Sequence, residues 1–461
     1  MPLQQLVWPE SSVFLDYFNT DSKDIWAEGI NDLYKEMPFD GLWLDMNEVT
    51  GFCNGNRSDS GKQCASKKSS FEKSDDVQEI QENYLNFLQA EKVTDDYKNF
   101  KRHQVQADTN TSWFMSYKDN MTDPSTYFLP FIPSLMYNFD NMTMSLNATH
   151  PQSGYTQYDT HSLFGHMECK ATWEILKEGA DQLAPFKDKR QFLLSRSTFS
   201  GSGQYTSHWT GDNHRTWDDM KWSIAGIMNF NMFGIPHVGA DVCGFFANVG
   251  TSEDENKEIC GRWMQLATFY PFARQHSNEV GGEPNEPYNL GDKYMPMAVA
   301  AIKDRYKYLM FMYGCLAKLE QNGGTCFDPL FFHYPDLNET YSNIESTFMV
   351  GDAIKVSPVL SAQGTETHFK VFFPQGNWVS MADYSTLVVK EDGDQVLDFP
   401  DTTVHAHLRP GSIVPVQDNT DVMTAADLTN KEFSLVVNRD TEGTAKGFVY
   451  ADDGTDNMAS A

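Results

Sequence analysis

Basic residues are scarce in this chain, which has 35 Lys and Arg against 64 Asp and Glu among 461 residues. The formal net charge of −29 would repel nucleic acid and anionic membrane surfaces, so neither is expected as a partner. No apolar run suggests a transmembrane span. Residues 1–10 contain charge and proline where a signal peptide needs an apolar run, so the N-terminus does not indicate the compartment.

Metal-binding patterns are also missing. The chain contains no Cys-x-x-Cys motif, which disfavours a zinc site, and we expect neither a metal nor a cofactor. Internal repeats and low-complexity tracts are absent as well. In contrast, hydrophobic residues make up 40% and aromatic residues 13% of the chain, which is enough for a sizeable core. The length exceeds that of one ordinary domain.

Two aspartates stand in aromatic, glycine-containing frames. Asp45 lies in residues 41–48, GLWLDMNE, and Asp212 lies in residues 208–213, HWTGDN. Hydrolysis of a glycosidic bond needs one carboxyl group to attack or stabilise an oxocarbenium-like centre and another to protonate the departing oxygen. Aromatic side chains stack on sugar faces and raise the pKa of a nearby carboxylic acid. The alternative is that each Asp is a helix cap or turn residue.

Three short apolar runs end in polar or charged side chains, namely residues 39–44, 192–197 and 235–241. A barrel strand delivers catalytic groups at its C-terminal end in this way. The three runs therefore predict one shared site.

With these motifs the chain resembles the α-glucosidases of glycoside hydrolase family 31 over nearly its whole length. Leu44, before the first aspartate, resembles the lysosomal and intestinal maltase branch of that family. The resemblance implies that Asp45 is the nucleophile and Asp212 the acid/base of a double displacement that retains the anomeric configuration.

The same resemblance assigns further residues. Arg196 would steer the nucleophile and the sugar hydroxyls, although a structural ion pair would equally use an arginine. Asp241 and Phe245 would line the sugar subsite. His276 would hydrogen-bond the bound glucose, or else be a structural histidine. Core packing is the alternative for the expected apolar and aromatic walls, which are Trp8, Trp43, Met46 and Trp209.

Cysteines and glycosylation sequons indicate the secretory pathway, either a lysosome-like vacuole or the outside of the cell. The sequons are at Asn56, Asn110, Asn120, Asn141, Asn147 and Asn338. Because family members carry bridges at the equivalent places, the resemblance implies the disulfides Cys53–Cys64 and Cys243–Cys260. The remaining cysteines, which we expect to be buried thiols, are Cys169, Cys315 and Cys326.

The expected fold is α/β, a partial (β/α)8 TIM barrel (strands four to eight) followed by antiparallel β-sandwich domains. The barrel would occupy residues 1–335 with an insertion at about 52–150, and a proximal β-sandwich residues 336–417. Residues 418–461 would begin a distal β-domain. By resemblance, the first three barrel strands and the domain before them are absent. We therefore expect a fragment of a longer enzyme with a half-built pocket, inactive by itself, or else a degenerate paralogue.

Periodicity places the main elements. The expected helices are residues 24–35, 75–93 and 294–319, and the expected antiparallel strands lie within 347–360, 369–374, 404–409, 432–438 and 447–452. The amphipathic helix 75–93 should pack on the barrel rim, with membrane or partner binding as the alternative.

Three functions stay open at this point. The first is an exo-acting α-glucosidase that releases glucose from α-1,4-linked maltose, malto-oligosaccharides or glycogen. The second is a glycan-binding remnant without turnover, and the third is an α-glucan lyase. Both aspartates stand in intact frames, which argues against simple decay. Oligomeric state and chain-length preference do not follow from the sequence.

Overall fold

The computed structural model describes residues 4–7, 10–50, 144, 148–247, 251–278, 284–342, 344–429 and 431–455. Several predictions lie outside these residues: helix 75–93, Trp8, the pair Cys53–Cys64, and the sequons at Asn56, Asn110, Asn120, Asn141 and Asn147. The chain divides into two compact units. One comprises Met1–Glu28 and Met46–Glu168, and the other comprises Gly29–Asp45 and Cys169–Ala461.

The first unit contains the antiparallel pair β1 (Gln4–Val7) and β2 (Glu10–Val13). Buried His150 joins two segments of this unit that are distant in sequence. Its Nδ1 lies 2.6 Å from Asp16 Oδ1, and its Nε2 lies 2.7 Å from Thr160 Oγ1.

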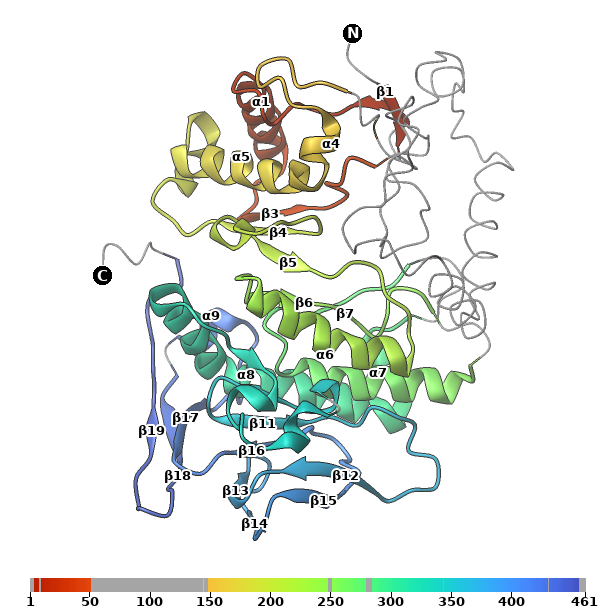
Figure 1. The fold of residues 1–461 in the computed structure, drawn as a ribbon, viewed down its shortest axis with the longest axis vertical. Helices are drawn as coiled ribbons and strands as arrows, with labels where there is room; N and C mark the ends of the chain where they lie inside the picture. Colours follow the sequence, from red (N-terminus) through yellow and green to blue (C-terminus); the bar gives the residue numbers. More distant parts are fainter. Residues whose placement is uncertain are drawn as a thin grey trace, which may run out of the picture. The chain divides into compact units, whose positions relative to one another are not determined.

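The second unit contains a four-stranded parallel sheet in the order β3, β4, β5, β6 (Figure 1). Its strands are β3 (Gly41–Leu44), β4 (Phe192–Ser195), β5 (Ser207–Trp209) and β6 (Val238–Gly239). The predicted runs 39–44 and 192–197 are confirmed as strands β3 and β4. Because all four strands run in the same direction, their C-terminal ends meet at one edge of the sheet.

The predicted run 235–241 divides after β6. The next strand, β7 (Asp241–Val242), pairs in parallel with β8 (Arg274–Gln275) and not with the four-stranded sheet. This change of partner places residue 241 directly opposite residue 274.

Helices pack on the last of these strands, α6 (Trp217–Met232) on β6 and α7 (Glu253–Ala267) on β7, and α8 (Gly291–Asn322) packs on α7. The boundaries between the two units fall within α1 (Ser22–Glu36) and α5 (Phe164–Glu178). The predicted helices 24–35 and 294–319 are confirmed as α1 and α8. Helix α6 begins at a capped turn, because Thr216 Oγ1 accepts a hydrogen bond of 3.0 Å from the Asp219 N–H.

The C-terminal part of the second unit is mainly antiparallel, as expected, although β17 (Ser412–Gln417) and β19 (Lys446–Gly447) pair in parallel. Its largest sheet has the order β14, β13, β16, β11, β10, β9, and a separate pair is formed by β12 and β15. These strands are β9 (Phe327–Asp328), β10 (Phe348–Val350), β11 (Ile354–Ser357), β12 (His368–Phe373), β13 (Gly376–Ser380), β14 (Thr386–Val389), β15 (Gly393–Asp398) and β16 (His405–Leu408). The strands expected within 347–360, 369–374 and 404–409 are therefore present.

A further sheet spans the expected boundary at residue 418. It has the order β18, β17, β19, with β17 (Ser412–Gln417) in the centre and β18 (Phe433–Asn438) at one side. The prediction of a strand over 447–452 is wrong for most of its length, because β19 is only Lys446–Gly447. Asp452 instead accepts a hydrogen bond of 2.8 Å from the Tyr313 hydroxyl on α8, which draws this segment away from the sheet.

The cysteines follow the expectations in part. The disulfide Cys243–Cys260 is confirmed, and Cys169 is a buried free thiol. The prediction of thiols at Cys315 and Cys326 is wrong, because these two residues form a disulfide between α8 and the residue just before β9. Sequence spacing could not show this, because the pairing depends on how the chain turns after the helix.

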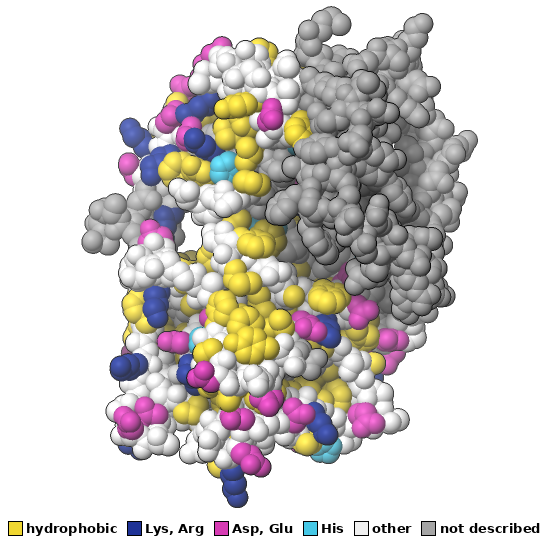
Figure 2. Space-filling model, in the orientation of Figure 1, with side chains coloured by type: hydrophobic (Ala, Val, Ile, Leu, Met, Phe, Trp, Pro, Cys, Tyr) yellow, Lys and Arg dark blue, Asp and Glu magenta, His cyan; other side chains and the backbone are white. Residues whose placement is uncertain are grey.

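Acidic side chains outnumber basic ones, but the two kinds are interspersed over the lower part of the face shown in Figure 2, with apolar side chains between them. Over the residues described, no helix combines the length and the apolar character that crossing a bilayer would require.

Candidate active site

The predicted site residues of the second unit gather where the parallel strands end. Asp45 directly follows β3, Arg196 directly follows β4, and Asp212 lies three residues after β5. Asp241 begins β7, and His276 directly follows β8. The local fold therefore delivers the side chains that the three apolar runs predicted.

Arg196 contacts the carboxylate of Asp45. Its Nη1 lies 3.3 Å from Asp45 Oδ1, and its backbone N–H donates a hydrogen bond of 3.3 Å to the Leu44 carbonyl. Asp45 keeps 46% of its side chain exposed, so this carboxylate remains open to a ligand. The pair therefore orients Asp45 without closing it off.

Asp212 has a different environment. Burial raises the pKa of Asp212, the positive charge of Arg196 opposes that rise, and the negative charges of Asp241 and Asp45 add to it. His276 lowers the pKa of Asp212 by a smaller amount. A carboxylic acid that holds its proton to higher pH than usual is suited to donating that proton.

Asp241 is completely buried. Its Oδ1 accepts two hydrogen bonds, one of 2.8 Å from Trp209 Nε1 and one of 2.6 Å from Arg274 Nη2. Burial raises the pKa of Asp241, while the hydrogen bond and charge of Arg274 and the hydrogen bond from Trp209 lower it. The two donors therefore connect strands β5, β7 and β8 at one carboxylate.

Asn213 ties the loop after Asp241 to the loop that carries Asp212. Its Nδ2 donates a hydrogen bond of 3.0 Å to the Asp241 carbonyl, and its Oδ1 accepts one of 3.0 Å from the Phe245 N–H. Gly244 has a φ of +78°, and a Cβ added there would lie 2.3 Å from the Arg215 nitrogen. Only glycine fits this turn, which brings Phe245 into place.

Aromatic rings surround these acids. The ring centroids of Trp43 and Trp209 lie 5.3 Å apart, edge to face, and those of Phe245 and His276 lie 4.9 Å apart. The pKa of His276 is lowered, first by burial and then by the charge of Arg274, whereas Asp212 and Asp45 act in the opposite direction. A neutral imidazole can both donate and accept hydrogen bonds with sugar hydroxyls.

The second unit thus brings together most of the residues predicted from sequence, which are Asp45, Asp212, Trp43, Arg196, Trp209, Asp241, Phe245 and His276. Met46 belongs to the first unit, where its backbone has a φ of +54°. Sequence reasoning missed Arg274 and Asn213. Both were adjacent or nearly adjacent to predicted residues, and the alternation of side chains along strand β8 was the available signal for Arg274.

No cluster of three or more His, Cys, Asp or Glu side chains that could hold a metal ion occurs among the residues whose placement is described. The polar groups available at this site are carboxyl groups, the guanidinium groups of Arg196 and Arg274, an imidazole and indole N–H groups. Such a set binds hydroxyl groups and transfers protons.

Comparison with known families yields two matches. A model of the glycosyl hydrolases family 31 TIM-barrel domain matches residues 2–315. A model of the glycosyl hydrolase family 31 C-terminal domain matches residues 323–414.

Individual proteins are similar over nearly the whole chain. An α-xylosidase of Arabidopsis thaliana is 33% identical over 98% of this chain and 44% of its own length. A probable α-glucosidase of Oryza sativa subsp. japonica is 32% identical, over 97% of this chain and 42% of its own length. The lysosomal α-glucosidase of Bos taurus is 29% identical, over 98% of this chain and 41% of its own length. This chain therefore spans less than half the length of these relatives.

The fold also has solved counterparts. A crystal structure of a glucosidase II α subunit superposes with a TM-score of 0.72 at 22% identity, and the match covers 100% of this chain and 39% of that chain. The expected architecture, a TIM-barrel domain followed by a C-terminal β-sandwich domain, is confirmed.

Proposed function

This chain belongs to glycoside hydrolase family 31, and we propose that it supplies the catalytic acids of a retaining exo-α-glucosidase acting on terminal α-1,4-linked glucose. One observation carries the proposal. Asp45 and Asp212 occupy one site with different environments, because Asp45 is exposed beside Arg196 and burial raises the pKa of Asp212. Two carboxyl groups with separate environments are what an acid and a nucleophile require.

In the proposed first step, an Asp45 oxygen attacks C1 of the terminal glucose, and the bond from C1 to the glycosidic oxygen breaks. Asp212 gives its proton to that departing oxygen. In the second step a water oxygen attacks C1, Asp212 takes the proton of this water, and the ester bond to Asp45 breaks. Two inversions at C1 leave the released glucose in the α configuration.

The surrounding residues would position the sugar. Arg196, which directs its guanidinium at Asp45, would hold this carboxylate and a sugar hydroxyl. Trp43 and Trp209, packed edge to face, would form an apolar wall for the ring, while His276 and Asp241 would bind further hydroxyls. Asp241 is available for this role through its second oxygen.

An α-xylosyl unit is a second candidate for the terminal sugar of the substrate. The observation that favours it is the 33% identity to an α-xylosidase, a value similar to those for the α-glucosidase relatives. Glucose and xylose differ at one hydroxymethyl group, so a small difference in pocket shape decides between them.

One experiment tests the reaction. The full-length protein is incubated with a 5-fluoroglucosyl fluoride, digested and mapped, and we expect the label on the peptide that contains Asp45. In addition, the protein should release α-glucose from maltose, with the anomer identified by NMR. A label elsewhere, a β product or an anhydro-sugar product would contradict the proposal. Comparing kcat/KM for 4-nitrophenyl α-glucoside and α-xyloside decides the sugar.

Compartment and domain organisation belong to the same proposal. The disulfides Cys243–Cys260 and Cys315–Cys326 support the secretory pathway, within a lysosome-like vacuole or outside the cell. Asn338 is the first residue of the 3-10 helix Asn338–Tyr341 and is exposed. Its exposure is compatible with glycosylation at this position. We keep a domain boundary near residue 335 as part of the proposal; the two family matches end at residue 315 and begin at residue 323, somewhat before it.

A further inference from the structure

We propose that Arg274 is a positioning residue of this site, which holds the buried carboxylate of Asp241 by one oxygen so that the other oxygen faces the bound sugar. This inference rests on the proposed function and extends it, because it assigns a task to a residue outside the predicted set. All the residues involved belong to the second compact unit.

The contact itself is short and shared. Arg274 Nη2 and Trp209 Nε1 both donate to Asp241 Oδ1, at 2.6 Å and 2.8 Å. Strands β7 and β8 run in parallel with residue 241 directly opposite residue 274, so the backbone register sets this pairing. The carboxylate can therefore rotate little without losing two hydrogen bonds.

The guanidinium of Arg274 is also held from the side. Its Cζ lies 4.1 Å from the ring centroid of Trp43 and 5.1 Å from that of Trp209. Contacts of this kind between a guanidinium and an indole are attractive and favour a defined orientation. Arg274 thus connects the strand before Asp45, the strand before Asp212, and Asp241.

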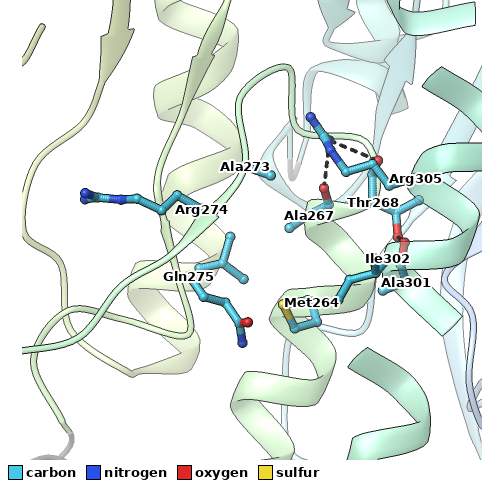
Figure 3. A pocket seen from close by; sticks show the side chains of 10 residues that line it. Met264, Ala267, Thr268, Ala273, Arg274, Gln275, Ala301, Ile302 and Arg305 are labelled. Carbon is cyan, nitrogen blue, oxygen red and sulfur yellow. Dashed lines mark hydrogen bonds between the residues drawn. The ribbon is translucent and has the colours of Figure 1, made fainter. Parts of the chain in front are cut away.

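A cavity lies beside Arg274, but the side chain of this arginine points away from it. Figure 3 shows Arg274 extending away from Met264, Ile302 and Arg305, which lie on the other side of the chain segment. The cavity lined by those residues is therefore not the place where the Arg274 charge acts. Its charge is directed instead to Asp241.

Close backbone packing makes this placement possible. A Cβ added at Gly239 on β6 would lie 1.9 Å from the Phe272 carbonyl oxygen. No side chain fits in that space, and the absence of one lets the segment before Arg274 lie against β6. The arginine consequently reaches the indoles of β3 and β5.

The second oxygen of the Asp241 carboxylate, Oδ2, is not bound by Arg274 or Trp209. Asp241 Oδ2 is buried, and in the part of the chain that the structure describes it accepts no hydrogen bond. A buried carboxylate oxygen without a donor is costly, and a sugar hydroxyl is a suitable donor. Because Arg274 and Trp209 occupy only Oδ1, the Oδ2 atom stays free for that hydroxyl.

Arg274 also provides a positive charge beside the buried Asp241 carboxylate. The charged groups that act on Asp241 are Arg274 on β8 and Asp45 after β3, and Asp241 in turn acts on Asp212 after β5. Three acids therefore lie close together, and Arg274 supplies the positive charge bonded to the most buried of them. Removing it would leave a buried carboxylate without a counter-charge.

The test uses four variants of the full-length protein: Arg274→Gln, Arg274→Lys, Asp241→Asn and the double variant Asp241→Asn with Arg274→Gln. Lys293→Gln is the control, because the exposed ion pair that it removes, with Asp254, does not involve the residues of the site. The measurements are KM and kcat for maltose, the Kd of an iminosugar glucose mimic, and Tm at about pH 5 and about pH 7.

We expect Arg274→Gln to raise KM and the iminosugar Kd at least tenfold and to lower Tm. The loss of Tm should be smaller at the lower pH, because protonation of Asp241 then removes the uncompensated buried charge. The double variant should recover most of the Tm but not the affinity. Arg274→Lys, which keeps the charge without the planar fork, should lie between wild type and Arg274→Gln.

Wild-type KM and Kd in Arg274→Gln would overturn the inference whatever the Tm, because the residue would then act only on stability. Recovery of affinity in the double variant would overturn it too, since Asp241 Oδ2 would then have no role with the sugar. If Arg274→Gln does not fold, the double variant and Arg274→Lys still decide. Failure of the proposed function looks different, because wild type itself would neither bind the iminosugar nor hydrolyse maltose.

Discussion

Arg196 Nη1 lies 3.3 Å from Asp45 Oδ1, and the Cζ of this arginine lies 5.6 Å from the ring centroid of Trp209. The arginine follows β4, so it stands between the strand that precedes Asp45 and the strand that precedes Asp212. This position lets one positive charge act on both acids, since Arg196 also lowers the pKa of Asp212.

Removing the proposed nucleophile should abolish turnover. We expect Asp45→Ala to lower kcat/KM for maltose by more than about 1,000-fold, because no other group can form the covalent ester. The measurement is steady-state glucose release by the full-length protein. Asp32→Asn, which changes an exposed acid on α1, is the matched control and should keep wild-type activity. Substantial activity in Asp45→Ala would remove this residue from the reaction.

Removing the proposed proton donor should affect substrates unequally. We expect Asp212→Ala to lower kcat/KM for maltose by about 100- to 10,000-fold, and to lower it much less for an aryl glucoside whose leaving group needs no proton. The two substrates are compared on the same preparation. An equal loss for both substrates would remove Asp212 as the proton donor. An aryl glucoside spared by Asp45→Ala but not by Asp212→Ala would reverse the two assignments.

The alkaline limb of the pH profile should follow the charges around Asp212. If Asp212 is the proton donor as proposed, activity should fall as pH rises through the pKa of Asp212, because the proton is then lost. Arg196 lowers and Asp241 raises this pKa. We therefore expect Arg196→Met to shift the alkaline limb of kcat/KM to higher pH and Asp241→Asn to shift it to lower pH. Shifts in the same direction for both variants would show that another group controls this limb.

A buried amine in the C-terminal sandwich should make stability depend on pH. Lys355 on β11 is completely buried and donates hydrogen bonds of 2.9 Å to Thr347 Oγ1 and 2.7 Å to Ser357 Oγ. Burial holds the pKa of Lys355 well below its usual value. The folded state thus favours the neutral amine, and the free energy of unfolding falls as pH drops from the usual lysine pKa towards the lowered one.

The test compares wild type with Lys355→Met by denaturant unfolding at about pH 9 and about pH 7. Wild type should lose up to about 1.4 kcal/mol of unfolding free energy per pH unit through this group, and the variant should not. Buried His407, opposite Lys355 in the β11–β16 pair, has a pKa lowered to about 3 and adds its own loss only at lower pH. Identical slopes for the two proteins would show that Lys355 stays charged in the fold.

The sequence by itself determined the two aspartates, the strand before Asp45 and the family. Asp45 was predictable because a polar residue at the end of a buried strand leaves a local signature, an apolar run followed by polar side chains. Asp212 was predictable from its aromatic, glycine-containing frame and from the family resemblance, whereas the short strand before it was not predicted. The helices α1 and α8 were predictable for a similar reason, since their periodicity is local. The confirmed disulfide Cys243–Cys260 came from resemblance and not from spacing.

Only the tertiary structure decided which side chains meet. The hydrogen bond between Arg274 and Asp241, the disulfide between Cys315 and Cys326 and the burial of Lys355 each depend on segments that approach one another through strand pairing or helix packing. No local pattern records such an approach, because hydrogen bonds and burial energies are set by neighbours that are distant in the chain. The residues proposed for the chemistry were therefore readable in the sequence, whereas the contacts that hold them and set their charge environment were not.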